Sequence, residues 1–184
     1  MKSATAGWKR NLLHFWFHAL SAAQRFGRDP AVDKLIVRHF VPVLTAMARR
    51  PVADFVTHPA DALAAILLFD QVPRNAFRDS ARAFAFDAKA RAITHAALRR
   101  GWLHGLRTEE RQFLLMPLMH SESIAEQRES LRRFTALGSP YIRNFALAHY
   151  RMVARFGRFP HRNAVLGRRS TPAEARAVAA GNHW

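Results

Sequence analysis

Apolar residues recur every three or four positions along most of the chain, which is the spacing of one face of an α-helix. The clearest stretch has its repeating positions at Val32, Leu35, Ile36, His39, Phe40, Val43, Leu44 and Met47. Stretches that alternate apolar and polar residues, as a half-buried β-strand does, are nearly absent. The pattern therefore predicts an all-α protein.

Capping residues and prolines indicate where these helices begin. A Ser, Thr or Asp directly before a helix accepts hydrogen bonds from its first N–H groups, and proline suits its first position. Such starts are found at Asp29-Pro30, Pro59, Thr108, Ser123, Ser139-Pro140 and Thr171. Ser123 with Glu126, and Thr171 with Glu174, have the spacing of capping boxes. Together with a first helix near the N-terminus, these signals predict seven to eight helices with short connections.

Three expectations concern individual helices. Residues 79–100 are the longest helical stretch, and Gly101 ends it. Pro42 and Pro117 fall inside helical patterns. Because proline removes a backbone hydrogen bond, we expect a kink or a break at Pro42 and an interruption of the helix at Pro117.

The first apolar run has two interpretations. Lys9 and Arg10 precede the mostly apolar residues 12–20, an order that suits a secretory signal. However, His14 and His18 break the run, and one helical stripe collects Leu12, Phe15, Trp16 and Ala19. We therefore interpret this segment as the first structural helix. No stretch reaches the ~18 uninterrupted apolar residues of a membrane span, so we expect no membrane insertion.

The length of 184 residues is typical of one domain, so residues 1–184 are expected to form a single all-α domain. Apolar residues make up 49% of the chain, which excludes wholesale disorder. The chain has no cysteine, which excludes a disulfide framework, thiolate metal ligands and a cysteine nucleophile. A reducing compartment is compatible with this composition, and we expect a cytoplasmic protein.

The formal charge of +16 raises the question of a nucleic-acid partner. The basic residues are spread evenly, however, because residues 1–92 hold 14 Lys and Arg and residues 93–184 hold 15. Nucleic-acid-binding proteins more often gather such residues in a patch or a tail. In addition, 25 of the 29 are Arg, as a GC-rich genome could produce without any ligand. The sequence therefore argues against nucleic acid as the specific partner.

Three polar clusters contain the candidate chemistry, and the first is Asp70-Gln71-Val72-Pro73-Arg74-Asn75. An Asp at a helix end lies beside unsatisfied carbonyl groups and needs a cationic partner, which Arg74 could supply. Asp70 is then a candidate acid or base, and Arg74 and Asn75 are candidate ligand-binding residues. The alternative is a salt bridge that only fixes the turn at Pro73.

The second cluster spans residues 109–122, beginning with Glu109-Glu110-Arg111 and ending with His120-Ser121-Glu122. His120 could act as a general base with Glu122 as its orienting carboxylate, because imidazole titrates near neutral pH. His120 could also bind a metal together with Asp70 or His149. In the structural alternative, this segment caps the next helix and His120 only satisfies a backbone group.

The third cluster is Arg155-Phe156-Gly157-Arg158-Phe159-Pro160-His161-Arg162-Asn163. Its three guanidinium groups can each donate paired hydrogen bonds to a carboxylate or phosphate, and they stay charged. Gly157 and Pro160 oppose a continuous helix, so the later cations are expected in a turn. The alternative is a solvated basic face.

These clusters resemble the signature blocks of a known family. The matching segments are Leu67–Arg78, Glu110–Glu122, Arg155–Asn163, Leu166–Arg168, Phe15–Phe17 and Ser170–Glu174. In this order and at these separations, they are similar to the bacterial domain-of-unknown-function family numbered 924, over nearly the whole chain. The resemblance implies a fold of the tetratricopeptide-like superfamily, in which antiparallel helix pairs stack into a right-handed layer. It implies no particular activity or cofactor.

We expect the three clusters to converge on one site. The leading hypothesis is a site for an anionic small molecule on a helical domain, with groups available for acid–base chemistry. The candidate acids and bases are Asp70, Glu110, His120, Glu122 and His161, and the candidate ligand-binding residues are Arg74, Asn75, Arg111, Arg155, Arg158, Arg162 and Asn163. No metal or cofactor is assigned. The alternative is a non-enzymatic scaffold whose arginines bind the terminal carboxylate of a peptide or protein partner.

Overall fold

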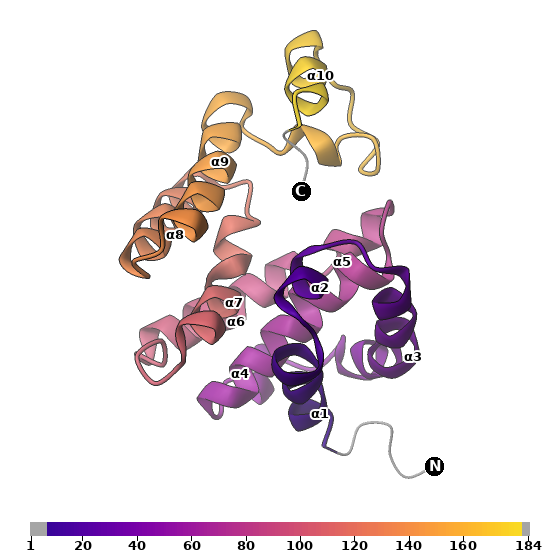
Figure 1. Ribbon diagram of the computed structural model, residues 1–184, viewed down its shortest axis with the longest axis vertical. Coiled ribbons are helices and arrows are strands. Elements are labelled where there is room, and N and C mark those ends of the chain that lie inside the picture. Colours follow the sequence, from indigo (N-terminus) through magenta and orange to yellow (C-terminus); the bar gives the residue numbers. More distant parts are fainter. Residues whose placement is uncertain (1–6, 182–184) are drawn as a thin grey trace. The chain divides into compact units, whose positions relative to one another are not determined.

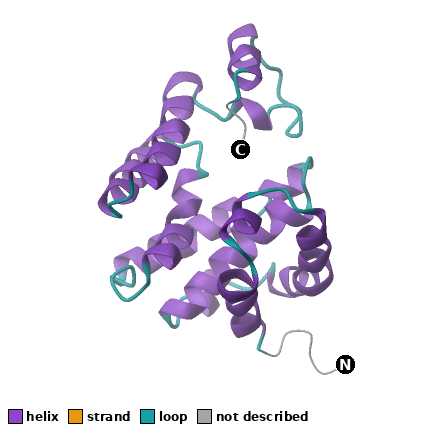
Figure 2. Cartoon of the chain, in the orientation of Figure 1, coloured by secondary structure: helices purple, strands orange, loops and turns teal. Residues whose placement is uncertain are grey.

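The computed structural model describes residues 7–181, and these residues form helices joined by loops, with no strand among them (Figure 2). The predicted all-α class is therefore confirmed. The chain divides into two compact units, the first made of residues 7–78 and 82–114 and the second of residues 79–81 and 115–181. A single domain over residues 1–184 stays a prediction.

The first unit contains helices α1 to α6 and the start of α7 (Figure 1). The bounds of these helices are α1 Trp8–His14, α2 Ala22–Phe26, α3 Pro30–Met47, α4 Pro59–Ile66, α5 Val72–Ala76, α6 Asp87–Arg99 and α7 Thr108–Met119. Two π-helical turns extend them, η1 at Phe15–Ala19 after α1 and η3 at Leu67–Gln71 between α4 and α5. Residues 8–19 and 59–76 are therefore two continuous helical rods.

The rod of residues 59–76 forms much of the core of the first unit. Its residues from Ala62 to Phe69 are almost completely buried, because apolar side chains cover all sides of this helix rather than one stripe. Helix α3 packs against α5, while α6 and α1 both pack against α4. This burial fixes the first predicted cluster, with Asp70 and Arg74, within the last turns of the rod.

Aromatic side chains complete the core of the first unit. The buried ring of Phe113 in α7 has its centroid 5.7 Å from the ring of Trp16 and 5.6 Å from those of Phe17 and Phe26. Edge-to-face pairs at such distances add to the stabilisation that burial provides. The interpretation of the first apolar run as a structural helix is confirmed, because Trp16 and Phe17 belong to this core.

The second unit contains the end of α7, α8 (Ile124–Ala136), α9 (Pro140–Phe156) and α10 (Pro172–Ala179). Helices α8 and α9 lie side by side and run in opposite directions (Figure 1). A 3₁₀ turn at Pro160–Arg162 follows α9. A small hydrophobic core links α9 to α10 and consists of Met152, Val153, Phe159 and Ala177. The antiparallel pair agrees with the layer that the family resemblance implies, and the complete layer stays a prediction.

When continuous segments are joined, the helices of residues 7–181 make nine rods. The one that the sequence pattern missed is α2, which has five residues and a capping box formed by Ser21 and Gln24. Its signal was hidden because Ser21 directly follows the apolar run of the first helix. Among residues 7–181, no helix is long and apolar enough to cross a membrane.

The predicted interruption at Pro117 is wrong and no break occurs at Pro42, because α3 and α7 both continue through these prolines; a kink at Pro42 stays a prediction. Pro42 deprives the carbonyl of Arg38 of its helical partner, but both residues are exposed, so that carbonyl is accessible to water. Pro117 lies in the last turn of α7, where the helix is already about to end.

The stretch of residues 79–100 is not the longest helix. Helix α6 begins only at Asp87, and the longest helix is α3, with 18 residues. Asp79 has a φ of 60°, in the left-handed region, and a 3₁₀ turn at Ala81–Phe84 follows it. Asp tolerates that conformation better than most residues, but a helix cannot continue through it.

The cap predictions are confirmed where the capping side chain accepts a hydrogen bond from the first turn of the helix that follows it. Asp29 caps α3, Ser139 caps α9, and Thr171 forms the expected capping box with Glu174. Ser123 makes no side-chain cap, and its own N–H donates to the hydroxyl of the preceding Ser121 over 3.1 Å. The prediction at Thr108 is wrong by one position, because Thr108 is already helical.

Phe113→Ala is expected to destabilise the protein by about 3–5 kcal/mol, because it leaves a cavity among rings that cannot collapse onto it. Tyr141→Ala is the control, since that side chain is 73% exposed and its loss should cost less than about 0.5 kcal/mol. Urea unfolding followed by circular dichroism measures both changes. Similar small losses in the two variants would show that Phe113 is not a central packing residue.

Candidate functional site

Arg74 joins two buried carboxylates in the first unit. Its Nη1 lies 3.1 Å from Oδ1 of Asp70 and 2.9 Å from Oδ1 of Asp87, and its Nη2 donates to Oδ2 of Asp87 over 3.1 Å. Burial by itself lowers the pKa of Arg74, but the charges of the two carboxylates raise it more, so the guanidinium stays charged. The predicted pairing of Asp70 with Arg74 is present, and it fixes the end of the central rod.

Asn75 extends this network to α3. Its Nδ2 donates to the carbonyl of Gln71 over 2.9 Å, and its Oδ1 accepts from Nη2 of Arg78 over 2.7 Å. Arg78 in turn donates to both carboxylate oxygens of Asp33 over 2.7 and 2.9 Å. Because both polar groups of Asn75 are used within the unit, the geometry favours a structural role for this residue.

Glu110 and Arg111 lie in the first turn of α7 and bind the loop before it. The two carboxylate oxygens of Glu110 accept from the backbone N–H and from Nη2 of Arg107 over 2.9 and 2.8 Å. Burial raises the pKa of Glu110, but these bonds lower it more. Arg111 donates to the carbonyls of Leu106 and His104 over 2.7 and 3.0 Å. Both side chains thus hold the loop between α6 and α7.

Glu122 fixes the segment after α9 in the second unit. Its Oε1 accepts the backbone N–H of Phe159 over 2.8 Å, and both of its oxygens accept from Arg168 over 2.7 and 2.9 Å. Burial raises the pKa of Glu122, but the bonds from Arg168 and Phe159 lower it more. A carboxylate held ionised in this way is better suited to positioning the turn than to accepting a proton.

Arg158 makes a second brace in the same unit. Its Nε and Nη2 donate to the two carboxylate oxygens of Glu174 over 2.6 and 3.0 Å. The backbone N–H of Thr171 also donates to Glu174, over 2.7 Å. The hydrogen bond from Arg158, followed by that from Thr171, lowers the pKa of Glu174 to about 2. Arg158 therefore fastens α10 to the turn after α9, which favours a structural role over ligand binding.

Two imidazoles and one guanidinium pack against Phe159, and a third imidazole lies beside one of them. The ring centroids of His149 and His161 lie 5.5 and 5.6 Å from that of Phe159, and the guanidinium carbon of Arg162 lies 4.5 Å from it. The rings of His120 and His149 are 6.2 Å apart. Phe159, His149 and Arg162 are buried. We refer to His120, His149, His161 and Arg162 as the histidine–arginine cluster.

His149 is a neutral imidazole in this cluster. Its Nδ1 lies 2.8 Å from the carbonyl oxygen of Phe145. Because a carbonyl only accepts, Nδ1 carries a proton and the lone pair of the neutral ring is on Nε2. Burial lowers the pKa of His149 well below its usual value, and the charges of its neighbours, that of His120 first, lower it further.

Buried polar atoms without a hydrogen-bond partner lie in the same unit. Within residues 7–181, they include Oε1 of Gln127, Oγ of Ser130 and Oδ1 of Asn163. The amide nitrogen of Gln127 donates to the two carbonyl groups that flank His120 in the sequence, and Asn163 directly follows Arg162. A buried polar atom left unsatisfied costs about 1–3 kcal/mol, so a ligand or a water molecule is expected at these atoms.

The predicted site residues are divided between the units. The first unit holds Asp70, Arg74, Asn75, Glu110 and Arg111, and the second holds His120, Glu122, Arg155, Arg158, His161, Arg162 and Asn163. Three of the predicted residues, His120, His161 and Arg162, come together in the histidine–arginine cluster. Arg155 is exposed, beside the ring of Phe156. Convergence of all three polar clusters on one site stays a prediction.

Several residues of these networks were missed by the sequence analysis. His149 lies near the third cluster in the sequence and is a possible metal ligand, but the sequence analysis does not select it as a site residue, although an imidazole among the apolar positions of α9 is a usable signal. Glu174 had been interpreted only as the third residue of a capping box. Asp87 and Arg168 carried no local signal, because each binds a partner 13 or more residues away in the sequence.

The histidine–arginine cluster is not arranged as a metal site. No group of three or more His, Asp or Glu side chains in the described part of the chain could hold a metal ion. The ring of Phe159 packs against both His149 and His161. The alternative in which His120 binds a metal with Asp70 or His149 is therefore not supported.

The all-α fold and these motifs define the class of protein. The model of a bacterial family of proteins of unknown function, DUF924, matches residues 12–182, so the chain belongs to this family. The chain is similar to the solved structure of a protein of unknown function from Agrobacterium tumefaciens, ATU0120, with 34% sequence identity and a TM-score of 0.90. This match covers 96% of this chain and 99% of the other. No curated protein matches. The family resemblance is thus confirmed.

Arg74→Ala is expected to destabilise the protein by about 3–5 kcal/mol, because Asp70 and Asp87 would lose the charge that compensates their burial. Arg50→Ala is the matched control, since Arg50 pairs with Asp54 at an exposed position and its loss should cost about 0–1 kcal/mol. Urea unfolding of both variants measures the difference. Equal losses would show that the two buried carboxylates do not depend on Arg74.

The brace between Arg158 and Glu174 should make stability depend on acidity. The folded-state pKa of Glu174 is about 2, below the ordinary value of 4.5, so its stabilisation is complete above pH 4.5 and is lost as the pH falls toward 2. Glu174→Gln lacks the brace at every pH. The difference in melting temperature between wild type and variant should therefore be largest above pH 4.5 and shrink below it.

Glu129→Gln on α8 serves as the control for this brace, because Glu129 pairs with arginines near the surface. It should change the melting temperature much less at every pH. A difference between wild type and Glu174→Gln that stays constant across the acidic range would contradict the ionic nature of the brace.

Proposed function

We propose that the second unit binds a small anionic molecule at the histidine–arginine cluster. The observation that supports this most is that the imidazoles of His149 and His161 and the buried guanidinium of Arg162 pack against one ring. The ring of His120 lies beside that of His149, which is kept from protonation. An anion stabilises such a group of like charges, and a positive potential in a low-dielectric site attracts one. The proposal concentrates the predicted anion site on His120, His161 and Arg162 and adds His149.

The unsatisfied oxygen atoms favour a ligand that also carries hydrogen-bond donors. The amide oxygens of Gln127 and Asn163 can only accept, so they require an N–H or O–H group. Arg162 can donate two parallel hydrogen bonds to a carboxylate or phosphate. A small hydroxy acid, an amino acid or a sugar phosphate would satisfy both requirements. Water alone could satisfy the amide oxygens, but it would bring no negative charge to the cluster.

The cluster also offers groups for acid–base chemistry. The neutral imidazole of His149 is a candidate general base for a bound substrate, and the imidazoles of His120 and His161 are further groups for proton transfer. A bound anion would raise the pKa of His149, because negative charge favours the imidazolium form. Ligand binding is thus the core of the proposal, and proton transfer is the reaction class that follows from it. The ligand would be a metabolite of the cytoplasm, the compartment that the sequence predicts.

A non-enzymatic scaffold for a peptide or protein partner is the second candidate. Tyr141 and Phe145 on α9 are exposed, and their rings lie edge to face with centroids 5.0 Å apart. Exposed aromatic side chains are enriched in protein interfaces. Arg143 lies between them in the sequence and is exposed as well, which favours an acidic partner.

Arg162→Lys tests the anion site, because lysine keeps the charge but lacks the planar fork. With phosphoserine, glycerol phosphate and citrate as calorimetric probes, we expect the variant to bind the best of them at least about tenfold more weakly than wild type. Arg155→Lys is the matched control, since Arg155 is exposed on the neighbouring turn, and it should bind as wild type does. Circular dichroism verifies the fold of both variants.

Two outcomes would contradict the anion site. One is unchanged affinity of Arg162→Lys for the probes. The other is no binding of any probe to the wild-type protein while an acidic peptide binds and the double variant Tyr141→Ala, Phe145→Ala does not, which would favour the scaffold.

A further inference from the structure

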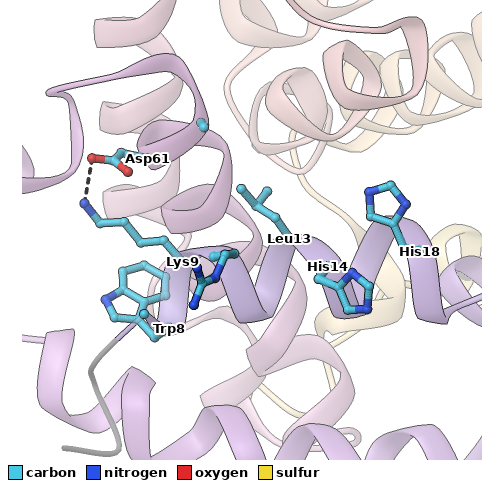
Figure 3. Close-up of a pocket in the computed structure, with 9 residues that line it drawn as sticks. Trp8, Lys9, Leu13, His14, His18 and Asp61 are labelled. Atoms are coloured by element: carbon cyan, nitrogen blue, oxygen red, sulfur yellow. Dashed lines mark hydrogen bonds and ion pairs between the residues drawn. The ribbon is translucent and has the colours of Figure 1, made fainter.

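A cavity of about 770 Å³ lies on the first unit, along α1, η1 and the start of α4 (Figure 3). Its volume falls within the ~300–1,000 Å³ range of small-molecule sites. Figure 3 shows Leu13, His14 and His18 following one another along the helix, while Lys9 extends to Asp61 of α4. The cavity therefore combines apolar and basic surface.

Asp61, the acidic residue among those that line the cavity, is already compensated. Its Oδ2 lies 2.6 Å from Nζ of Lys9 and accepts the hydroxyl of Thr57 over 2.8 Å. A carboxylate bound in this way does not neutralise further cations. The remaining charge of the lining is therefore positive.

Three basic side chains on one helical face supply that charge. Arg10, His14 and His18 follow at intervals of four residues and are all exposed, so they lie above one another along the helix. The rings of His14 and His18 are stacked, with centroids 5.4 Å apart and planes at 22°. Within residues 7–181, none of the three forms an ion pair. Glu110 of α7 is electrostatically coupled to His18, but both of its oxygens are bound to Arg107.

The geometry of the stacked imidazoles is a reason to expect an anion here. The rings of His14 and His18 lie side by side on the exposed face, so their ring N–H groups can donate hydrogen bonds to the oxygen atoms of one anion. Arg10, one turn earlier, adds a fixed charge and a fork that matches phosphate or carboxylate oxygens. The partly exposed Leu13 and the edge of the buried Trp8, which is 6% exposed, line the same cavity, and Leu13 above all offers apolar contact to the rest of a ligand.

We infer that this cavity binds an organic phosphate with an apolar or aromatic body. The phosphate lies against Arg10, His14 and His18, and the apolar body lies against Leu13 and Trp8. This site belongs to the first unit and is independent of the anion site proposed for the second unit.

Phenyl phosphate is the test ligand, because it joins a phosphate to a small apolar ring. Calorimetric titration of the wild-type protein should give an affinity at least about tenfold higher than that for inorganic phosphate, because only phenyl phosphate makes the apolar contacts. Arg10→Ala and His14→Asn should each weaken phenyl phosphate by at least about fivefold. Arg38→Ala and His39→Asn are the matched controls, since both residues are exposed on α3 and should leave the affinity unchanged.

Three results would overturn this inference. Equal affinities for phenyl phosphate and inorganic phosphate would mean general counterion binding to a basic protein. An equal loss in Arg10→Ala and Arg38→Ala would mean the same. A loss of phenyl phosphate binding in Arg162→Lys would place the ligand in the second unit instead. If only the anion site of the second unit is wrong, Arg10→Ala and His14→Asn should still weaken the binding of phenyl phosphate.

Discussion

A charge removed from water costs several kcal/mol unless an opposite charge and hydrogen bonds accompany it. In both units, the guanidinium groups of arginines supply this charge and these hydrogen bonds to carboxylates. Arg74 joins two carboxylates at the end of the central rod in the first unit. In the second unit, Arg168 holds Glu122 and Arg158 holds Glu174, each through two carboxylate oxygens. A lysine offers a single point of charge and could not replace these forks. Some of the arginines that outnumber the lysines in this chain therefore have a structural role, whether or not a GC-rich genome produced them.

The features that the sequence predicted well are those decided within one helical turn. Asp29 and Thr171 cap their helices because the N–H groups that they bind lie within three residues of each cap. The start of α6 was missed for the opposite reason. The alanine-rich residues 79–86 have the composition of a helix, but Asp79 takes a left-handed conformation that no periodic pattern reveals. Pro42 does not break α3, because the cost of a proline depends on whether the carbonyl that it frees is accessible to water, which a sequence does not show.

The candidate site was predicted less completely, because a sequence displays charges without their partners. Arg155, Arg158 and Arg162 looked equivalent as anion receptors. In the folded chain the first is exposed, the second is bound to a carboxylate 16 residues later, and the third is buried against Phe159. Only the folded arrangement of α8, α9 and the following turn identifies His149 as a member of the proposed site. Its importance lies in neighbours that are brought together by tertiary structure.

Imidazoles differ from guanidinium groups in that they can remain neutral until a ligand arrives. In the second unit, Glu122 pairs with Arg168 and is also electrostatically coupled to Arg162, while Glu174 pairs with Arg158. His149 is kept neutral first by its burial and then by the positive charges of its neighbours. An anion entering the cluster would counter those charges, so binding would be coupled to proton uptake. That coupling is what a general acid–base catalyst needs, because the proton is then acquired only when substrate is present. The cost of burying an uncompensated charge thus has two consequences. It makes the carboxylates pair with arginines, and it keeps the histidines neutral until an anionic ligand binds.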